Sequence, residues 1–249
     1  MRTSNPALRN AFEPQDLTLG ERMTVSGTVN KTGVLAICVV ATAAWTWNRF
    51  LNSPNPDEAI ASIRPLLAVG AIGGFIVAIV TVFKRTWAPI TAPIYALLEG
   101  LVLGSISAIT ELRLPGVPMQ AVGLTFGTLV ALLLVYRSGL IRVTDNFRLG
   151  VVAATGGIAL FYAVTMIMGF FGVHFPSVFG AGPLGIGISI FVVIIAALNL
   201  VLDFDLIENG ARAGAPKYME WYGAFALMVT LIWLYLEILR LLSRLRSRN

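Results

Sequence analysis

The chain has 249 residues, of which 57% are hydrophobic and only 12% are charged. Soluble domains carry about 25% charged residues, and disordered chains are poorer still in apolar residues. The composition therefore excludes both classes and predicts an integral membrane protein. A net charge of +5 could suggest nucleic-acid binding, but the basic residues lie between and beyond apolar segments. That placement indicates membrane topology, and we expect a lipid bilayer and no nucleic acid as partner.

Seven apolar runs follow a polar N-terminal tail, residues 1–31. A transmembrane helix needs about 20 apolar residues, and continuous rather than alternating apolar runs favour helices over a membrane barrel. We predict an all-α membrane protein, with a seven-transmembrane-helix bundle and a short basic C-terminal tail over residues 32–249. The runs are Thr32–Phe50, Pro65–Phe83, Ile90–Thr110, Met119–Tyr136, Leu149–Gly172, Pro183–Phe204 and Trp221–Leu242.

Two pairs of glycines are spaced four residues apart within these runs, Gly100 with Gly104 and Gly123 with Gly127. Helices in lipid associate through close backbone contact, which small residues permit. We expect these pairs to mark packing faces within one bundle. An oligomer interface is the alternative.

The basic residues predict the orientation of the chain. If all seven runs cross, the N-terminal side carries eleven lysines and arginines and the opposite side seven. If the last run does not cross fully, the division becomes fifteen to three. Both divisions place the N-terminus in the cytoplasm.

Four acidic residues lie within the apolar runs or at their edges: Glu99, Asp203, Asp205 and Glu237. No lysine or arginine lies at comparable depth, and a charge at the centre of a spanning helix costs at least about 2.5–3.5 kcal/mol. We therefore expect these acids to be protonated, to share protons or to meet a cation. The pattern predicts a proton-sensitive or cation-conducting interior.

Helical geometry separates the two acids of the sixth run. Residues two apart point in nearly opposite directions, so Asp203 and Asp205 cannot face the same spot. Asn199 shares the face of Asp203, which also fits a position at the membrane surface because polar residues follow it. Two carboxyl groups brought together in a low-dielectric environment titrate as a unit.

Enzymatic chemistry finds little support in the sequence. The single cysteine, Cys38, excludes a disulfide framework, and the single histidine, His174, excludes a histidine-rich metal cluster. An intramembrane aspartyl protease would need an aspartate in a GxGD setting, which is absent. We expect no enzymatic activity and no tightly bound cofactor.

Several segments together resemble the Bax inhibitor-1 family, in its bacterial branch. They are an aromatic-Asp segment in the sixth run, a Leu-Tyr-Leu-acid segment in the seventh, a Glu-Gly segment in the third, and two N-terminal segments. In this sequence they are residues 202–207, 234–242, 97–104, 5–8 and 23–33.

The resemblance implies a pH-dependent calcium leak in the bacterial cytoplasmic (inner) membrane. It also implies a proton-sensing carboxylate pair that binds calcium transiently, which by motif match would be Asp205 and Glu237. The seventh-run acid is Glu where the family has Asp, and the interval of 32 residues between the two is long. Asp203 is therefore a rival for the sixth-run position.

The hypothesis from sequence is a cation path through the bundle. A proton shared by Asp205 and Glu237 would hold the last two helices together, and deprotonation would loosen them or free the carboxylates for calcium. A proton-coupled secondary transporter is one alternative, although the seven runs contain no convincing inverted repeat. A non-conducting scaffold that regulates partner proteins is the other.

Overall fold

The computed structural model describes residues 22–141, 143–172 and 180–248, and within them the chain is helical. Seven helices are long and apolar enough to cross a membrane, which confirms the predicted all-α seven-helix bundle. His174 lies outside the described residues. The long helices are α2 (Val25–Leu51), α3 (Pro56–Phe83), α4 (Ala88–Arg113), α5 (Val117–Arg137), α6 (Asp145–Phe170), α8 (Pro183–Arg212) and α9 (Met219–Arg246), with the short 3-10 helix η2 (Arg85–Trp87) before α4.

The helices extend beyond the apolar runs that predict them. Helix α2 begins at Val25, seven residues before the first run, because Thr24 caps it: the Thr24 hydroxyl accepts a hydrogen bond from the Gly27 amide at 2.9 Å. Helix α3 begins at Pro56, a residue type suited to the first turn of a helix. The last residues of the polar tail are therefore helical.

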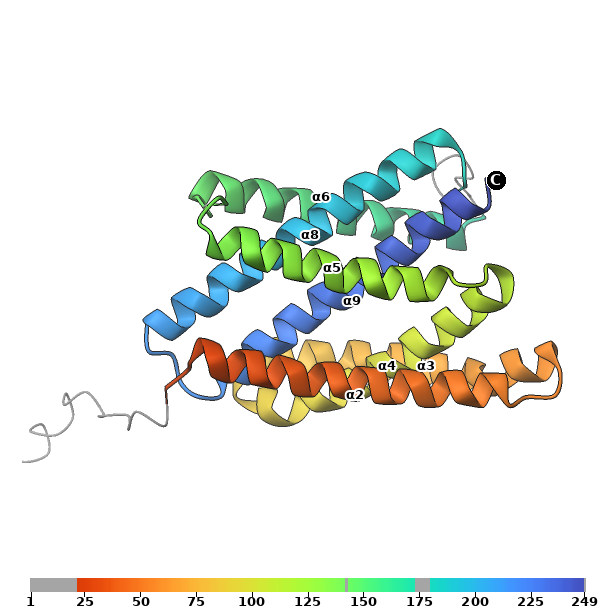
Figure 1. Cartoon of the computed structure of the whole chain (residues 1–249), viewed down its shortest axis with the longest axis horizontal. Helices are drawn as coiled ribbons and strands as arrows, with labels where there is room; N and C mark the ends of the chain where they lie inside the picture. The colour runs from red at the N-terminus through yellow and green to blue at the C-terminus, as the bar shows by residue number, and fades with distance from the viewer. Residues whose placement is uncertain (1–21, 142, 173–179, 249) are drawn as a thin grey trace, which may run out of the picture.

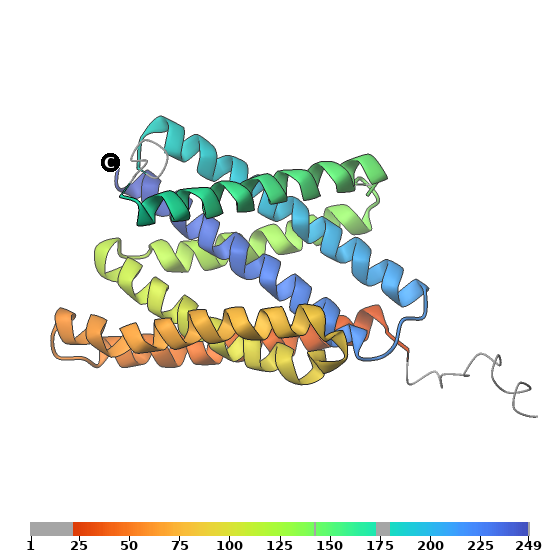
Figure 2. The same cartoon turned by 180° about the vertical axis from the view of Figure 1, so that it is seen from behind.

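Helix α9 is the central helix of the bundle and packs against α2, α4, α5 and α8 (Figure 1). In its most apolar stretch 61% of residues are buried, against 11% in α5 and in α6. Seen from behind, α8 and α9 run obliquely between the α2–α3–α4 group and the α5–α6 group (Figure 2). Glu237, one of the four predicted acids, thus lies on the helix whose side chains are most shielded.

The glycine pairs differ in what they contact. A Cβ on Gly104 would lie 2.6 Å from the carbonyl oxygen of Ala43, and one on Gly100 would collide with Thr42, so α4 packs closely on α2 there. Gly123 and Gly127 have no atom within 4 Å of such a Cβ. The packing prediction is confirmed for the α4 pair, whereas the α5 pair packs against nothing in the described chain.

Helix α9 runs the full length of the bundle. Near its C-terminal end the buried guanidinium of Arg244 donates hydrogen bonds to the Gly185 carbonyl and, at 2.7 Å, to the Ser189 hydroxyl, both at the start of α8. Its last turn also borders Leu114 in the α4–α5 turn. The end of α9 therefore lies opposite the start of α2 (Figure 1), and the basic residues that the structure describes divide eight to seven between the two ends.

Candidate functional site: acidic residues inside the helix bundle

Glu237 is buried in α9, with 2% of the residue exposed. Its Oε1 accepts hydrogen bonds from Arg240 at 2.6 Å and from Tyr162 and Trp233 at 3.3 Å each. Its Oε2 is buried and has no hydrogen-bond partner among the described residues. One half of this carboxylate is therefore fully engaged, and the other half is available to a proton or a cation.

Asp205 lies near the C-terminal end of α8, and its Oδ2 accepts a hydrogen bond from the Arg148 guanidinium of α6 at 2.6 Å. The Asp205 side chain is 17% exposed and that of Arg148 is 52% exposed. Asp205 also lines a cavity of about 870 Å³ between α2, α5, α8 and α9. Asp205 thus lies between the bundle interior and this cavity, at the end of the bundle where α2 begins.

The structure does not bring Asp205 and Glu237 together as a pair. Asp205 lies seven residues before the end of α8 at Arg212, whereas Glu237 lies eighteen residues after the start of α9 at Met219. At about 1.5 Å per residue, their heights above the turn are roughly 10 Å and roughly 27 Å. The long interval noted in the sequence explains this offset, and each acid has its own arginine.

Asp203 and Asn199 lie where α8 meets α6 and α9. The Asn199 amide donates to the Thr155 hydroxyl of α6 at 2.8 Å. Asp203 interacts with the Thr230 hydroxyl of α9, and its Oδ2 is buried without a partner among the described residues. The two residues share a helix face, as predicted, and this face points into the bundle rather than toward the membrane surface.

Glu99 lies apart from these residues, on α4. It interacts with the Tyr95 hydroxyl one turn earlier, and its carboxylate packs on Gly74 of α3, where an added Cβ would lie 2.9 Å from Oε1. Tyr95 is buried and meets Phe225 of α9 edge to face at 5.0 Å. Glu99 therefore belongs to the α3–α4 contact and not to the α8–α9 hairpin.

The polar residues of α6, α8 and α9 form a series along the bundle, which we call the polar ladder. Counted along each helix from the end of the bundle where α2 begins, at about 1.5 Å per residue, successive members differ in height by roughly 7 Å at most. In order they are Arg148 with Asp205, Asp203 with Thr230, Asn199 with Thr155, Glu237 with Tyr162 and Arg240, and Ser189 with Arg244.

One expectation from sequence was wrong for two of the four acids: basic side chains reach Asp205 and Glu237. Long stems let Arg148 and Arg240 extend their guanidinium groups to carboxylates that lie deeper than their own backbones. Arg244 is itself buried, at 8% exposure, and binds the start of α8 without an acidic partner among the residues that the structure describes. The acids on the hairpin are thus partly neutralised from within the chain.

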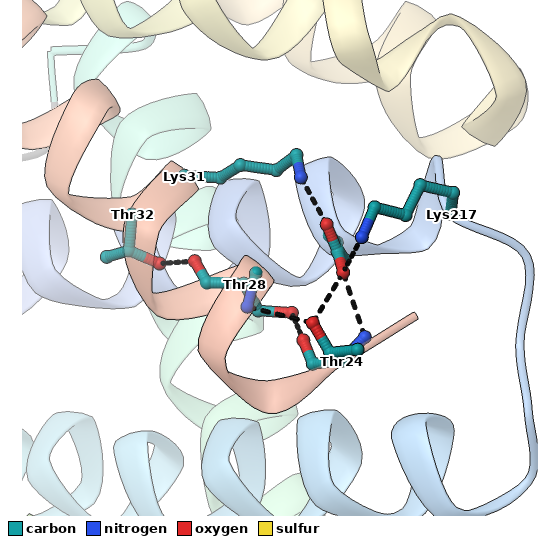
Figure 3. Close-up of polar contacts among 7 residues, drawn as sticks. Thr24, Thr28, Lys31, Thr32 and Lys217 are labelled. Atoms are coloured by element: carbon teal, nitrogen blue, oxygen red, sulfur yellow. Dashed lines mark hydrogen bonds and ion pairs between the residues drawn. The ribbon is translucent and has the colours of Figure 1, made fainter. Parts of the chain in front are cut away.

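A further buried acid, Glu220, was not selected from the sequence (Figure 3). Its carboxylate forms ion pairs with Lys31 and Lys217 and accepts hydrogen bonds from the Thr24 amide and hydroxyl at 2.9 and 2.8 Å. These contacts join the first turn of α2 to the first turn of α9. The only hint in the sequence is Lys217 three residues before Glu220, and Lys31 is too distant in sequence to be foreseen.

The described residues contain no group of three or more His, Cys, Asp or Glu side chains placed to hold a metal ion. Calcium usually takes six to eight oxygen ligands. A cation at Asp205 or Glu237 would therefore depend on water and other oxygens for most of its coordination, which suits passage better than storage.

The family of the chain follows from comparison with known proteins. The family model described as Bax inhibitor 1 like matches residues 5–247, and the chain therefore belongs to this family. It is a multi-pass membrane protein of the Bax inhibitor-1-like type. Searches of curated proteins and of solved structures return no match to the chain.

Proposed function

We propose that this protein is a pH-dependent cation leak, with calcium among the conducted ions, and that the polar ladder is its path. The observation that carries the proposal is the half-engaged carboxylate of Glu237, which is buried at the contact of α9 with α6 and has one oxygen without a partner in the described part of the chain. A buried carboxylate in that state is expected to exchange protons or cations.

In this proposal the arginines are tethered competitors of the conducted cation. Arg148 and Arg240 side chains are 52% and 42% exposed, whereas their partners Asp205 and Glu237 are 17% and 2% exposed. The arginine side chains are therefore less enclosed by the protein than the acids are and freer to move away from the contact. Departure of a guanidinium leaves a carboxylate that a free cation can bind.

The proposal gives a direction for the effect of pH. Protonation of Asp205 or Glu237 removes the negative charge that binds the passing cation. Flux is therefore expected to fall on acidification and to rise as the carboxylates deprotonate. As in the hypothesis from sequence, deprotonation increases flux. The closed state, however, now depends on two separate carboxylate–arginine pairs and not on a proton shared by Asp205 and Glu237.

The proposed orientation has the N-terminus in the cytoplasm of a bacterial cell, with the protein in the inner membrane. It rests on the count made from the sequence, in which a full crossing of all seven runs assigns eleven lysines and arginines to the N-terminal side and seven to the other. The Asp205–Arg148 pair would then lie at the cytoplasmic end of the ladder, and Glu237–Arg240 toward the opposite end.

Calcium entry into liposomes that contain the purified protein tests this function. Glu237→Gln is expected to reduce flux at least several-fold and to flatten its pH dependence. Asp57→Asn, which changes an exposed acid in the first turn of α3, is the matched control and should conduct normally. Unchanged flux and pH response in Glu237→Gln would reject the assignment, and saturable counterflow would indicate a carrier.

A further inference from the structure

A groove opens on the side of the bundle between α2 and α5. Two hollows of about 870 and 150 Å³ adjoin there and share Ala36, Phe126 and Leu231 in their walls. Helices α2 and α5 both pack on α9, which together with α8 forms the floor, while the two helices stand apart from each other (Figure 1).

The walls of the groove are apolar where it faces the bilayer. Val29 on α2 and Val130 on α5 are 61% and 54% exposed at its rim. Both helices are spanning helices, so the opening faces the hydrocarbon layer. An apolar hollow open to hydrocarbon neither retains water nor stays empty, so acyl chains are its natural filling.

The charges at the N-terminal end of the groove favour an anionic group. Asp205 is held by Arg148, and Glu208 is held by Arg212 and by the Tyr136 hydroxyl. Arg137, exposed at the end of α5, lines the groove and has no ion-pair partner among the residues described.

We propose that the groove binds one anionic phospholipid, with an acyl chain between α2 and α5 and the phosphate at Arg137. Basic residues at the ends of spanning helices bind acidic lipid head groups in this way. The binding goes beyond the proposed leak and does not depend on it. A glycerophospholipid with a net negative head group, such as phosphatidylglycerol, satisfies both the apolar walls and the charged rim.

Lipid binding to the full chain, purified in detergent, can be counted by native mass spectrometry during titration with phosphatidylglycerol. Gly33→Leu places a side chain in the groove without collision, since no atom lies within 4 Å of a Cβ at Gly33. Gly157→Leu is the matched control, because Gly157 is an exposed helical glycine on α6 with equally open surroundings. We expect the tightest-bound lipid to be lost in Gly33→Leu and kept in Gly157→Leu.

The head-group contact has its own variant pair. Arg137→Gln is expected to weaken phosphatidylglycerol binding about fivefold, whereas Arg113→Gln, at the exposed end of α4 on the opposite side, should not. This pair also decides the matter if Gly33→Leu does not fold.

Four results would overturn the proposal. Equal retention of lipid by Gly33→Leu and Gly157→Leu would place the lipid elsewhere. Equal affinity for phosphatidylcholine, or competition by free glycerol phosphate as effective as the lipid itself, would remove either the charge or the chain from recognition. A dimer that Gly33→Leu abolishes would assign the groove to a second copy of the chain.

Discussion

The carboxylate of Glu220 on α9 occupies the space into which a side chain at Gly27 of α2 would extend. Gly27 therefore lets the two first turns approach, and Glu220 fills the gap with a charge held by Lys31 and Lys217 (Figure 3). The same junction includes Met23, whose amide donates to the Ala215 carbonyl at 2.7 Å. The start of α2 is thus fixed to the α8–α9 turn at the base of the hairpin that carries the polar ladder.

Gly27→Ala should destabilise the protein, because the added methyl group collides with the Glu220 carboxylate. Overpacking of this kind costs about 1–3 kcal/mol. Gly33→Ala is the control, since its Cβ meets nothing and alanine favours a helix. Unfolding in detergent, followed by circular dichroism against denaturant, should give a lower midpoint for Gly27→Ala alone. Equal midpoints would show that the contact between Gly27 and Glu220 can adjust to the added methyl group without loss of stability.

Glu220→Gln should be more damaging, because it leaves Lys31 and Lys217 near a buried position without a counter-charge. Removing one partner of a buried ion pair costs about 3–5 kcal/mol. Adding Lys31→Met to Glu220→Gln should restore part of that loss, because fewer charges remain unpaired. A double-mutant cycle of unfolding free energies measures this coupling, and strictly additive losses would mean that the pair contributes nothing.

The Ser107 and Tyr235 hydroxyls, both in buried residues, lie 2.6 Å apart and join α4 to α9. Ser107→Ala leaves the Tyr235 hydroxyl without this partner and should cost about 1–3 kcal/mol. The double variant Ser107→Ala with Tyr235→Phe should recover much of the loss, since no buried hydroxyl then remains. Thermal unfolding of Ser107→Ala, Tyr235→Phe and the double variant tests this. A lower unfolding temperature for the double variant than for Ser107→Ala would contradict it.

The full crossing of α9 predicts opposite labelling at the two ends of the bundle. In a Cys38→Ala background, Ser138→Cys after α5 and Ser247→Cys after α9 place exposed thiols at opposite ends. A membrane-impermeant maleimide added to whole cells should label Ser247→Cys and spare Ser138→Cys until the cells are opened. Labelling of both from one side would mean that α9 does not cross.

The apolar runs were sufficient to predict the helices, because the need for about 20 apolar residues in a bilayer leaves a signal in sequence. That Asp203 and Asn199 share one face also followed from helical geometry, whereas the inward direction of that face did not. The structure does not bring Asp205 and Glu237 together as the motif match suggested, because they lie at different distances from the α8–α9 turn. The arginine partners were missed because Arg148 comes from another helix and Arg240 reaches back by one turn.

The most direct test of the proposed leak compares calcium flux through Arg148→Gln and Asp205→Asn in liposomes of matched composition. Both variants break the same partly exposed ion pair, so their effects on stability should be small, below about 1 kcal/mol. If the carboxylate is the ligand of the passing cation and the arginine its competitor, Arg148→Gln raises flux and Asp205→Asn lowers it. Flux that changes in the same direction in both variants, or in neither, would contradict the account.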